Sequence, residues 1–185
     1  MPDKRVAGIS GNITRPSKTR GFVDHIVHRL ALSIGASAQT FDIEDFGPSL
    51  PNARRLDDLA PEARYLVSQV IEADVLVVGS PTFKGSYTGL FKHCFDLFDP
   101  TSLRGKPIII AATGGGERHS LIVEHQLRPL FGFFEALAMP TAIYASDKDF
   151  ADGVLFSEAI HARVGQAVDE ATRAVARSDW RSIAA

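Results

Sequence analysis

The sequence predicts one α/β domain in which helices cover both faces of a parallel sheet. Short apolar runs alternate with segments of helical periodicity along the chain. The runs at residues 75–78 and 108–113 are apolar without alternation, which is typical of strands buried on both faces. Polar loops rich in Gly, Ser and Thr follow the first, third and fourth runs, and parallel strands bring such loops to one edge of the sheet. These observations predict a doubly wound, three-layer sandwich with its site at that edge.

Composition supports a single globular domain and narrows its partners. The chain has 185 residues, of which 45% are hydrophobic, so one domain over residues 1–185 can bury a sizeable core. The formal net charge of −2 gives no reason to expect nucleic acid or a membrane surface as a partner. Cys94 is the only cysteine, which excludes an internal disulfide and a CxxC pair. With no secretory leader and no apolar run of about 20 residues, we expect a cytoplasmic protein.

The first strand and its loop form a candidate phosphate site. Residues 6–10 are apolar, and a helical pattern begins only after Ser17. The helix N-terminus offers unsatisfied N–H groups, Ser17 or Thr19 can cap it, and Arg15 and Lys18 would add positive charge. An ordinary capped helix with two solvated basic residues is the alternative. Neither the P-loop pattern nor GxGxxG fits this loop, which disfavours nucleoside triphosphates and Rossmann-type dinucleotide binding.

The next elements continue the alternation. Gly35 closes the first helix, residues 39–43 form a predicted second strand, and a polar, proline-rich connection over 46–58 leads to a second helix over 63–71. The third strand, 75–78, runs into the polar loop 79–88 and then into a helix that carries apolar residues as far as Phe98. Cys94 lies on this helix among apolar neighbours, which predicts an inert thiol in the core or at an interface.

The fourth strand, residues 108–113, ends in Gly114, Gly115 and Gly116. Three glycines there allow close backbone approach or positive φ, and a plain flexible turn is the alternative. The segment 119–137 is predicted as a helix, and its apolar residues occupy more than one face, which favours packing on another subunit. Residues 141–145 form the predicted fifth strand and 160–175 the closing helix.

A crevice with one phosphate-friendly loop and two glycine-bearing loops suits a mononucleotide with a planar ring, namely flavin mononucleotide (FMN). Three motifs, ISGN-x4-SKT over 9–19, GSPTFKGSYTGLFKHCFDLF over 79–98 and ATGGGERHS over 112–120, resemble the NAD(P)H-dependent FMN reductases of flavodoxin-like fold. The resemblance covers most of the chain and is closest to the reductase components of two-component alkanesulfonate and methanesulfonate monooxygenase systems. It implies a flavodoxin-like three-layer sandwich with a five-stranded parallel sheet of order 2-1-3-4-5.

The resemblance also implies which residues bind the cofactors. The phosphate would be held by Ser10, Asn12, Ser17, Lys18 and Thr19, with Arg15 as a further candidate. The ribityl chain and one ring face would contact Pro81, Thr82, Phe83 and Lys84, and the pyrimidine edge would meet backbone groups of Thr113, Gly114, Gly115 and Gly116. His119 would touch a nicotinamide dinucleotide or cap its helix, and Lys84 would contact a phosphate or stay solvated. Phe83 departs from the family, whose members mostly have Tyr there, so no hydrogen bond comes from that side chain.

The implied reaction transfers a hydride from the nicotinamide C4 of NADH or NADPH to the flavin N5. It needs stacking distance and orientation rather than a catalytic acid or base. The reduced flavin would serve a partner monooxygenase, and a dimer or a tetramer of the enzyme fits the sequence. The alternatives are a reductase that keeps its FMN and reduces quinones, azo dyes or metal ions, a flavodoxin-type electron carrier, which the near-neutral charge disfavours, and a flavin-free binding module.

Pro129 lies inside the predicted fourth helix and has no N–H to donate to the carbonyl of His125. The usual outcomes are a kink or a one-residue π-bulge. The resemblance implies such an insertion at His125, in a helix at a tetramer interface near the flavin. A proline kink with a satisfied interface histidine is the alternative.

Overall fold

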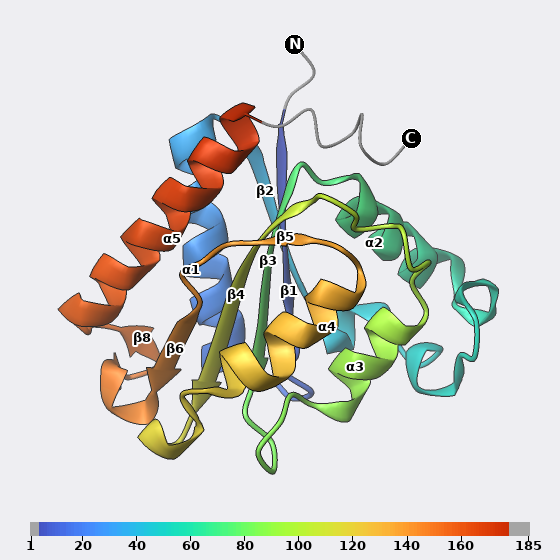
Figure 1. The fold of residues 1–185 in the computed structure, drawn as a ribbon. Coiled ribbons are helices and arrows are strands. Elements are labelled where there is room, and N and C mark those ends of the chain that lie inside the picture. The colour runs from blue at the N-terminus through green and yellow to red at the C-terminus, as the bar shows by residue number, and fades with distance from the viewer. Residues whose placement is uncertain (1–3, 178–185) are drawn as a thin grey trace.

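A parallel sheet runs through the centre of the molecule. The structure is a computed structural model that describes residues 4–177. The strands are β1 (Arg5–Ser10), β2 (Ser37–Asp42), β3 (Val75–Pro81), β4 (Pro107–Gly114), β5 (Leu137–Ala138) and β6 (Ile143–Ser146). Their order is β2-β1-β3-β4-β5, with β6 also paired to β4 (Figure 1). The predicted order 2-1-3-4-5 is therefore confirmed.

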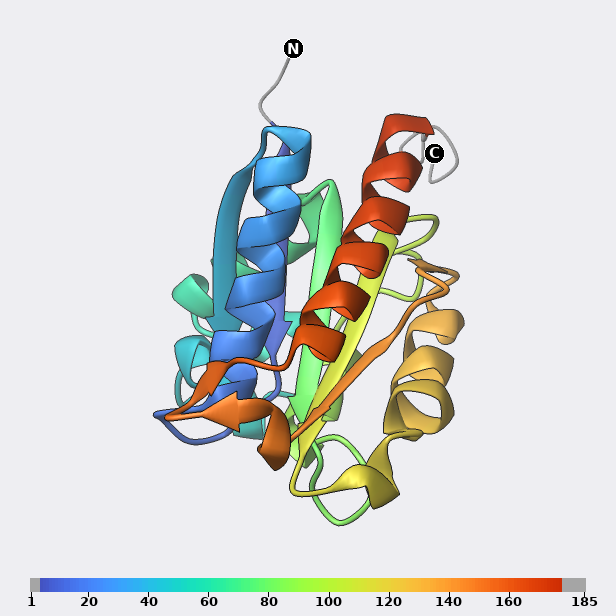
Figure 2. The same cartoon turned by 90° about the vertical axis from the view of Figure 1, so that its left-hand side faces the viewer.

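Helices cover both faces of the sheet (Figures 1 and 2). On one face α1 (Lys18–Ile34) and α5 (Glu158–Arg177) enclose an apolar core. On the other face α2 (Pro61–Glu72), α3 (Gly89–Asp96) and α4 (Arg128–Phe133) enclose a second core, rich in phenylalanine. Because β3 and β4 lie between these two cores, both of their faces are buried, as the continuous apolar runs predict.

Short elements connect the layers. The polar connection after β2 contains three turns of 3₁₀-helix, η1 (Ile43–Phe46), η2 (Leu50–Asn52) and η3 (Leu56–Asp58). After β6, the turn η6 (Asp147–Asp149) leads into an antiparallel hairpin outside the main sheet, β7 (Phe150–Ala151) with β8 (Val154–Leu155). Within residues 4–177, no helix has the length and apolar character that crossing a membrane requires.

The segment after β4 departs from the expectation of one long helix. Residues 119–137 begin at the end of a 3₁₀ turn, η4 (Glu117–His119), pass through a π-helix, η5 (Val123–Leu127), and continue as α4. Glu135 has a φ of 53°, and Leu137 N–H then donates to the carbonyl of Lys106 at 2.9 Å. The chain thus turns back along β4, where β5 pairs with the start of that strand and β6 with its end. The predicted strand over 141–145 corresponds to β6.

Two glycines let α1 lie directly on the sheet. A Cβ at Gly8 would lie 2.6 Å from Val27 Cγ2, and a Cβ at Gly79 would lie 2.5 Å from Val23 Cγ2. Both valines are fully buried. Contacts this short leave no room for a methyl group, so glycine at these strand positions fixes the distance between α1 and the middle of the sheet.

Gly79→Ala should lower the free energy of unfolding by about 1–3 kcal/mol, because the added methyl group overpacks against Val23. Urea denaturation followed by circular dichroism measures this change. Gly21→Ala is the matched control: no atom lies within 4 Å of a Cβ built there, so alanine in α1 should be neutral or stabilising by up to about 1 kcal/mol. Equal stability of Gly79→Ala and the wild-type protein would contradict such close packing of α1.

Candidate functional site

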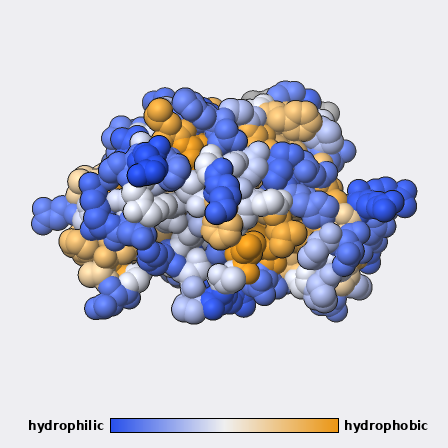
Figure 3. All heavy atoms as spheres, turned by 90° about the horizontal axis from the view of Figure 1, so that it is seen from below, coloured by the Kyte–Doolittle hydropathy of each residue, from blue (hydrophilic) through white to orange (hydrophobic). Residues whose placement is uncertain are grey.

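The carboxyl ends of the strands surround a shallow hollow of about 270 Å³. The loops after β1, β3 and β4 meet there, as the sequence predicts, and η6 adds a further wall. Seen from below, this end of the molecule has residues of intermediate hydropathy near its centre, with hydrophilic residues around them and an apolar patch to one side (Figure 3). The lining residues are Asn12, Ile13, Thr14, Pro16, Ser17, Lys18, Thr19, Pro81, Thr82, Phe83, Thr113, Gly114, Gly115 and Asp147.

Most of the predicted site residues line this hollow. The structure brings together ten of the fifteen, from all three predicted loops. The five that lie outside the lining are Ser10, Arg15, Lys84, Gly116 and His119.

Helix α1 begins at the wall of the hollow. Ser17 is its N-cap, and the Ser17 hydroxyl accepts a hydrogen bond from the backbone N–H of Arg20 at 3.2 Å. The first N–H groups of a helix have no intrahelical acceptor and carry partial positive charge. Thr19 is buried, and its hydroxyl lies 2.6 Å from that of Thr113, which ties α1 to β4. An anion in the hollow would therefore meet donors that are already oriented.

Ser10 and Asn12 hold the loop that follows β1. The Ser10 hydroxyl donates to Asn12 Oδ1 at 2.6 Å, and Asn12 Nδ2 donates to the carbonyl of Thr14 at 3.2 Å and to Asp42 Oδ2 at 3.0 Å. Both side chains are buried, and only Asn12 reaches the wall of the hollow. These hydrogen bonds fix the path of the loop.

Arg15 lies on a pair of carboxylates rather than in the hollow. Its guanidinium donates to Asp42 at 2.8 and 2.5 Å and to Asp45 at 2.6 Å. Burial raises the pKa of Asp42, but hydrogen bonds from Arg15, Asn12 and Arg20 outweigh burial and lower that pKa from 3.8 to about 2. The expectation that Arg15 adds charge to a phosphate site conflicts with this geometry, because the guanidinium would have to leave two ionised carboxylates.

A tight turn carries Phe83 at the side of the hollow. Phe83 and Ser86 exchange backbone hydrogen bonds of 2.8 and 3.1 Å. Between them Lys84 and Gly85 have φ values of 52° and 86°, and positive φ at both central residues is typical of a type I′ turn. Phe83 is 48% exposed, and Lys84 is exposed at the tip of the turn. The turn therefore presents an aromatic side chain that the chain itself leaves largely uncovered.

The glycine loop after β4 is held by Thr82 and Tyr144. The Thr82 N–H and hydroxyl both donate to the carbonyl of Thr113, at 2.7 and 2.9 Å. The Tyr144 hydroxyl donates to the carbonyl of Gly116 at 2.6 Å, and a Cβ at Gly114 would lie 2.3 Å from the same hydroxyl. Gly114 is therefore required for close approach, and positive φ occurs at none of the three glycines. The sequence analysis did not predict a role for Tyr144. The one indication was a residue with a hydroxyl group in an otherwise apolar strand.

Few groups around the hollow can carry a charge. Lys18 and Asp147 are the ionisable side chains among the described residues that line it, and Lys18 Nζ donates to Asp147 Oδ1 at 2.5 Å. His119 ends η4, where it is half-buried. Burial raises the pKa of the Cys94 thiol to about 12, in agreement with the predicted inert thiol. No group of three or more His, Cys, Asp or Glu side chains within residues 4–177 is placed to hold a metal ion.

The predicted break before Pro129 is a π-helix. In η5 the Arg128 N–H donates to the carbonyl of Val123, five residues back, instead of four. Pro129 lies in the first turn of α4, where a missing N–H is tolerated. His125 is exposed within the π-helix and lines a separate groove of about 620 Å³ together with Phe133. The interruption of the helical hydrogen-bond pattern that Pro129 predicts is therefore confirmed, and of the two expected outcomes the structure has the π-bulge.

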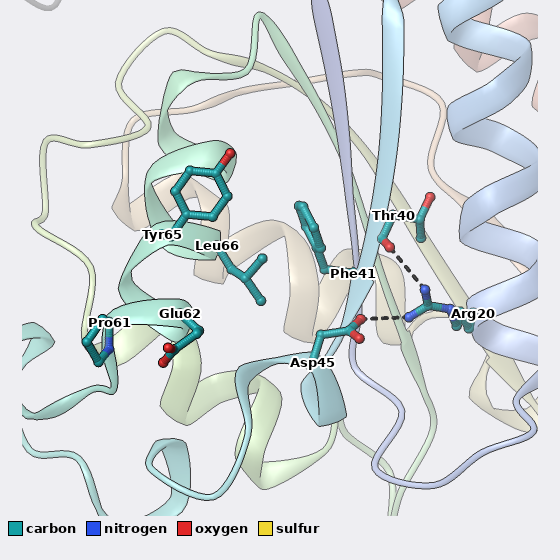
Figure 4. A pocket seen from close by; sticks show the side chains of 8 residues that line it. All are labelled: Arg20, Thr40, Phe41, Asp45, Pro61, Glu62, Tyr65 and Leu66. Carbon is teal, nitrogen blue, oxygen red and sulfur yellow. Dashed lines mark hydrogen bonds and ion pairs between the residues drawn. The ribbon is translucent and has the colours of Figure 1, made fainter.

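A larger hollow of about 650 Å³ lies at the β2 edge of the sheet, between β2 and α2 (Figure 4). Arg20 at one side of it donates to Asp45 at 2.8 Å and to the carbonyl of Thr40 at 3.1 Å. Glu62 places a carboxylate in the first turn of α2. A paired cation and this carboxylate disfavour an anionic ligand, so volume alone does not identify the site.

Known proteins share this architecture and much of the sequence. A family model described as NADPH-dependent FMN reductase matches residues 4–151. The chain is 37% identical over 167 residues to an FMN reductase (NADPH) of Pseudomonas aeruginosa, covering 90% of each chain. It is 38% identical over 167 residues to the NADH-dependent FMN reductase SfnF of Pseudomonas fluorescens, covering 90% of this chain and 89% of the relative. The crystal structure of an oxidoreductase from Corynebacterium diphtheriae has a TM-score of 0.85 and 32% identity, covering 96% of this chain and 99% of its own.

Asp42→Asn should lower the free energy of unfolding at neutral pH, and it should lower it by less in acid. A depressed pKa means that Asp42 stabilises the folded state above its unfolded pKa of 3.8 and that this contribution is lost as pH falls through about 2. A pKa lowered from 3.8 to about 2 corresponds to roughly 2 kcal/mol. The difference in unfolding free energy between the wild-type protein and the variant, measured in urea, should narrow across that window. Asp57→Asn, at an exposed position of η3, is the control and should change little. A difference independent of pH would contradict the network around Asp42.

Proposed function

The chain belongs to the NADPH-dependent FMN reductase family, and from that premise we propose that it reduces FMN as an exchangeable substrate and releases it to a partner monooxygenase. The family uses FMN and reduced pyridine nucleotide, so the enzyme is an NAD(P)H-dependent FMN oxidoreductase. The observation that carries the proposal is the hollow at the strand ends, where a helix N-terminus, an exposed aromatic side chain and a glycine loop meet. The motif resemblance to reductases of two-component monooxygenase systems supports the choice of partner.

The residues at the hollow fit the parts of FMN. Ser17, Lys18 and Thr19 at the start of α1 would hold the phosphate. Phe83 would contact one face of the ring, because its side chain is exposed beside the hollow. Gly115 has no atom within 4 Å of a Cβ built on it, so this part of the loop leaves space for the ring edge. FMN, when bound, supplies the atom that accepts the hydride.

The protein's own contribution to the reaction is orientation. The turn at Phe83 and the loop at Gly114 bound the hollow from two strands, β3 and β4, whose pairing fixes their separation. Thr82 joins the two loops through its hydrogen bonds to Thr113. Backbone N–H groups of the glycine loop would face the pyrimidine edge and stabilise the negative charge that reduction places there. Such an arrangement promotes hydride transfer without a side-chain acid or base.

The shallowness of the hollow supports exchange of FMN. Its volume of about 270 Å³ is small for a site that encloses a ligand of this size. Flavin held there would remain partly exposed on the ring face opposite Phe83, where a nicotinamide ring could approach. A reductase that keeps FMN and reduces quinones, azo dyes or metal ions is the alternative, and it requires more complete enclosure of the flavin.

We place the subunit contact of a homo-oligomer at the face formed by η5 and α4. Leu121, two residues before η5, is 58% exposed, Phe133 at the end of α4 is 67% exposed, and His125 and Phe133 line the groove of about 620 Å³. Apolar side chains this exposed on neighbouring helical segments are typical of an interface, and a second copy of the chain fits the predicted oligomeric helix. We expect a cytoplasmic dimer or tetramer in which this contact adjoins the flavin sites.

Purified apoprotein should oxidise NADH or NADPH only when free FMN is added, and the rate should saturate with FMN concentration. The reason is that flavin enters and leaves the shallow hollow in each turnover. Nucleotide absorbance follows the reaction, and both nucleotides are tested with and without FMN. A stoichiometric yellow protein that ignores added flavin and reduces quinones directly would contradict release and favour the alternative.

Replacing Ser17 and Lys18 together by Ala should raise the KM for FMN by roughly tenfold or more, since each lost charge-assisted hydrogen bond costs on the order of 1.5–3 kcal/mol. The KM for riboflavin, which has no phosphate, should change little. Arg5→Ala is the control, because it removes a positive charge that pairs with Glu72 at the start of β1, outside the hollow. An unchanged KM for FMN in the double variant would rule out phosphate binding at this loop.

Deleting His125 should convert η5 into regular α-helix, tighten retention of FMN and reduce turnover with free FMN. A π-helix accommodates one extra residue, and the deletion removes it. His125→Gln keeps the chain length and serves as the control. Gel filtration checks the oligomeric state, and the flavin dissociation rate is measured for both variants. If the deletion variant is folded and oligomeric and releases FMN as fast as the wild-type protein, the π-helix has no role in flavin exchange.

A further inference from the structure

The phosphate loop is neutralised by carboxylates of the protein itself. Arg15 is held by Asp42 and Asp45, which leaves Lys18 as the single basic side chain among the described residues that line the hollow. Lys18 Nζ in turn lies 2.5 Å from Asp147 Oδ1. Asp147 is also the single acidic side chain in that lining. The formal charges of the lining side chains therefore cancel at the place where FMN would bring a phosphate dianion.

The position of Asp147 is fixed by a turn at the end of β6. Ser146 N–H and Ser146 Oγ both donate to Asp149 Oδ2, at 2.8 and 2.9 Å, in a capping box that shapes η6. Phe150, the next residue, places its ring centroid 6.0 Å from Lys18 Nζ. The turn thus holds the Asp147 carboxylate beside the start of α1, although 129 residues separate Asp147 from Lys18 in the sequence.

This pair is exposed, in contrast to the network around Asp42. The Lys18 and Asp147 side chains are 43% and 60% exposed, whereas Arg15, itself 47% exposed, binds the carboxylate of Asp42, which is 0% exposed. Exposed ion pairs are weak and exchange partners readily, because water compensates for each lost contact. Lys18 is therefore free to leave Asp147 for a stronger anion, whereas departure of Arg15 would remove two hydrogen bonds from the buried carboxylate of Asp42.

We propose that Asp147 acts as a built-in competitor of the flavin phosphate: it holds Lys18 when the site is empty and repels the bound phosphate when Lys18 has moved to it. Both effects weaken FMN binding selectively over riboflavin and so make FMN an exchangeable substrate. The inference rests on the proposed function and assigns to Asp147 an affinity-setting role. Asp147 takes no part in the hydride transfer.

The test compares Asp147→Asn with the wild-type protein by titrating each apoprotein with FMN and with riboflavin and following flavin fluorescence. Asp147→Asn should bind FMN about fivefold more tightly, the scale expected for an exposed charge pair, and should bind riboflavin unchanged. The inhibition constant of inorganic phosphate as a competitor of FMN should fall correspondingly in this variant. Asp152→Asn is the matched control: it removes the same charge from the β7–β8 turn, where φ is 50°, a conformation that asparagine tolerates.

The outcomes separate this inference from the proposed function. Tighter binding of FMN alone, seen in Asp147→Asn and absent in Asp152→Asn, supports the competitor role. If the wild-type protein binds FMN and Asp147→Asn binds FMN no more tightly, the competitor role is overturned and the reductase function still stands. An equal gain for riboflavin also overturns it, because the effect then does not act on the phosphate. Failure of the wild-type protein to bind FMN would overturn both. Equal melting temperatures of the three proteins establish that folding is not the cause.

Discussion

The direct contact between α1 and the two glycines of the central strands is the constraint on which the site depends. With Gly8 and Gly79 beneath Val27 and Val23, no side chain separates the helix from the strands at these two positions. The N-terminus of α1 consequently lies beside the ends of β1, β3 and β4, close enough for Thr19 to bond a residue of β4. The start of α1 and the loops after β3 and β4 are therefore parts of one crevice, in which the proposed phosphate and ring sites would be neighbours.

Electrostatics at this crevice divide into a buried part and an exposed part. The buried part links Ser10, Asn12 and Asp42 to Arg15, and its hydrogen bonds determine the shape of the first loop. Arg15 is partly exposed, but it stays in place because its departure would deprive the buried Asp42 carboxylate of a partner, which is costly. The exposed pair of Lys18 and Asp147 has no such penalty. The first loop is held rigidly, and the neighbouring Lys18 on α1 can exchange Asp147 for another anion. This combination suits a ligand that binds and dissociates in each turnover.

The sequence predicted most of the fold, because the relevant signals are local. Continuous apolar runs indicated strands buried on both faces, Gly, Ser and Thr indicated the loops at their ends, and Pro129 indicated a break in the helix ladder. Each of these depends on residues within a few positions. The turn that brings the chain back to β4 at β5 depends instead on the positive φ of Glu135, which no pattern in that segment announces.

The site was predicted less completely, because its remaining partners meet only through the fold. Arg15 looked like a phosphate ligand until the fold placed it on Asp42, 27 residues away. Tyr144 and Asp147 were missed for the same reason: each reaches the crevice from the fifth strand or the turn after it.

A crystal structure of the protein with FMN would show whether FMN lies in the crevice at the strand ends with its phosphate on α1. We expect the phosphate at the backbone N–H groups following Ser17, with Lys18 turned from Asp147 towards it, and the ring between Phe83 and Gly115. Flavin bound instead in the hollow between β2 and α2, or a phosphate distant from α1, would contradict this placement.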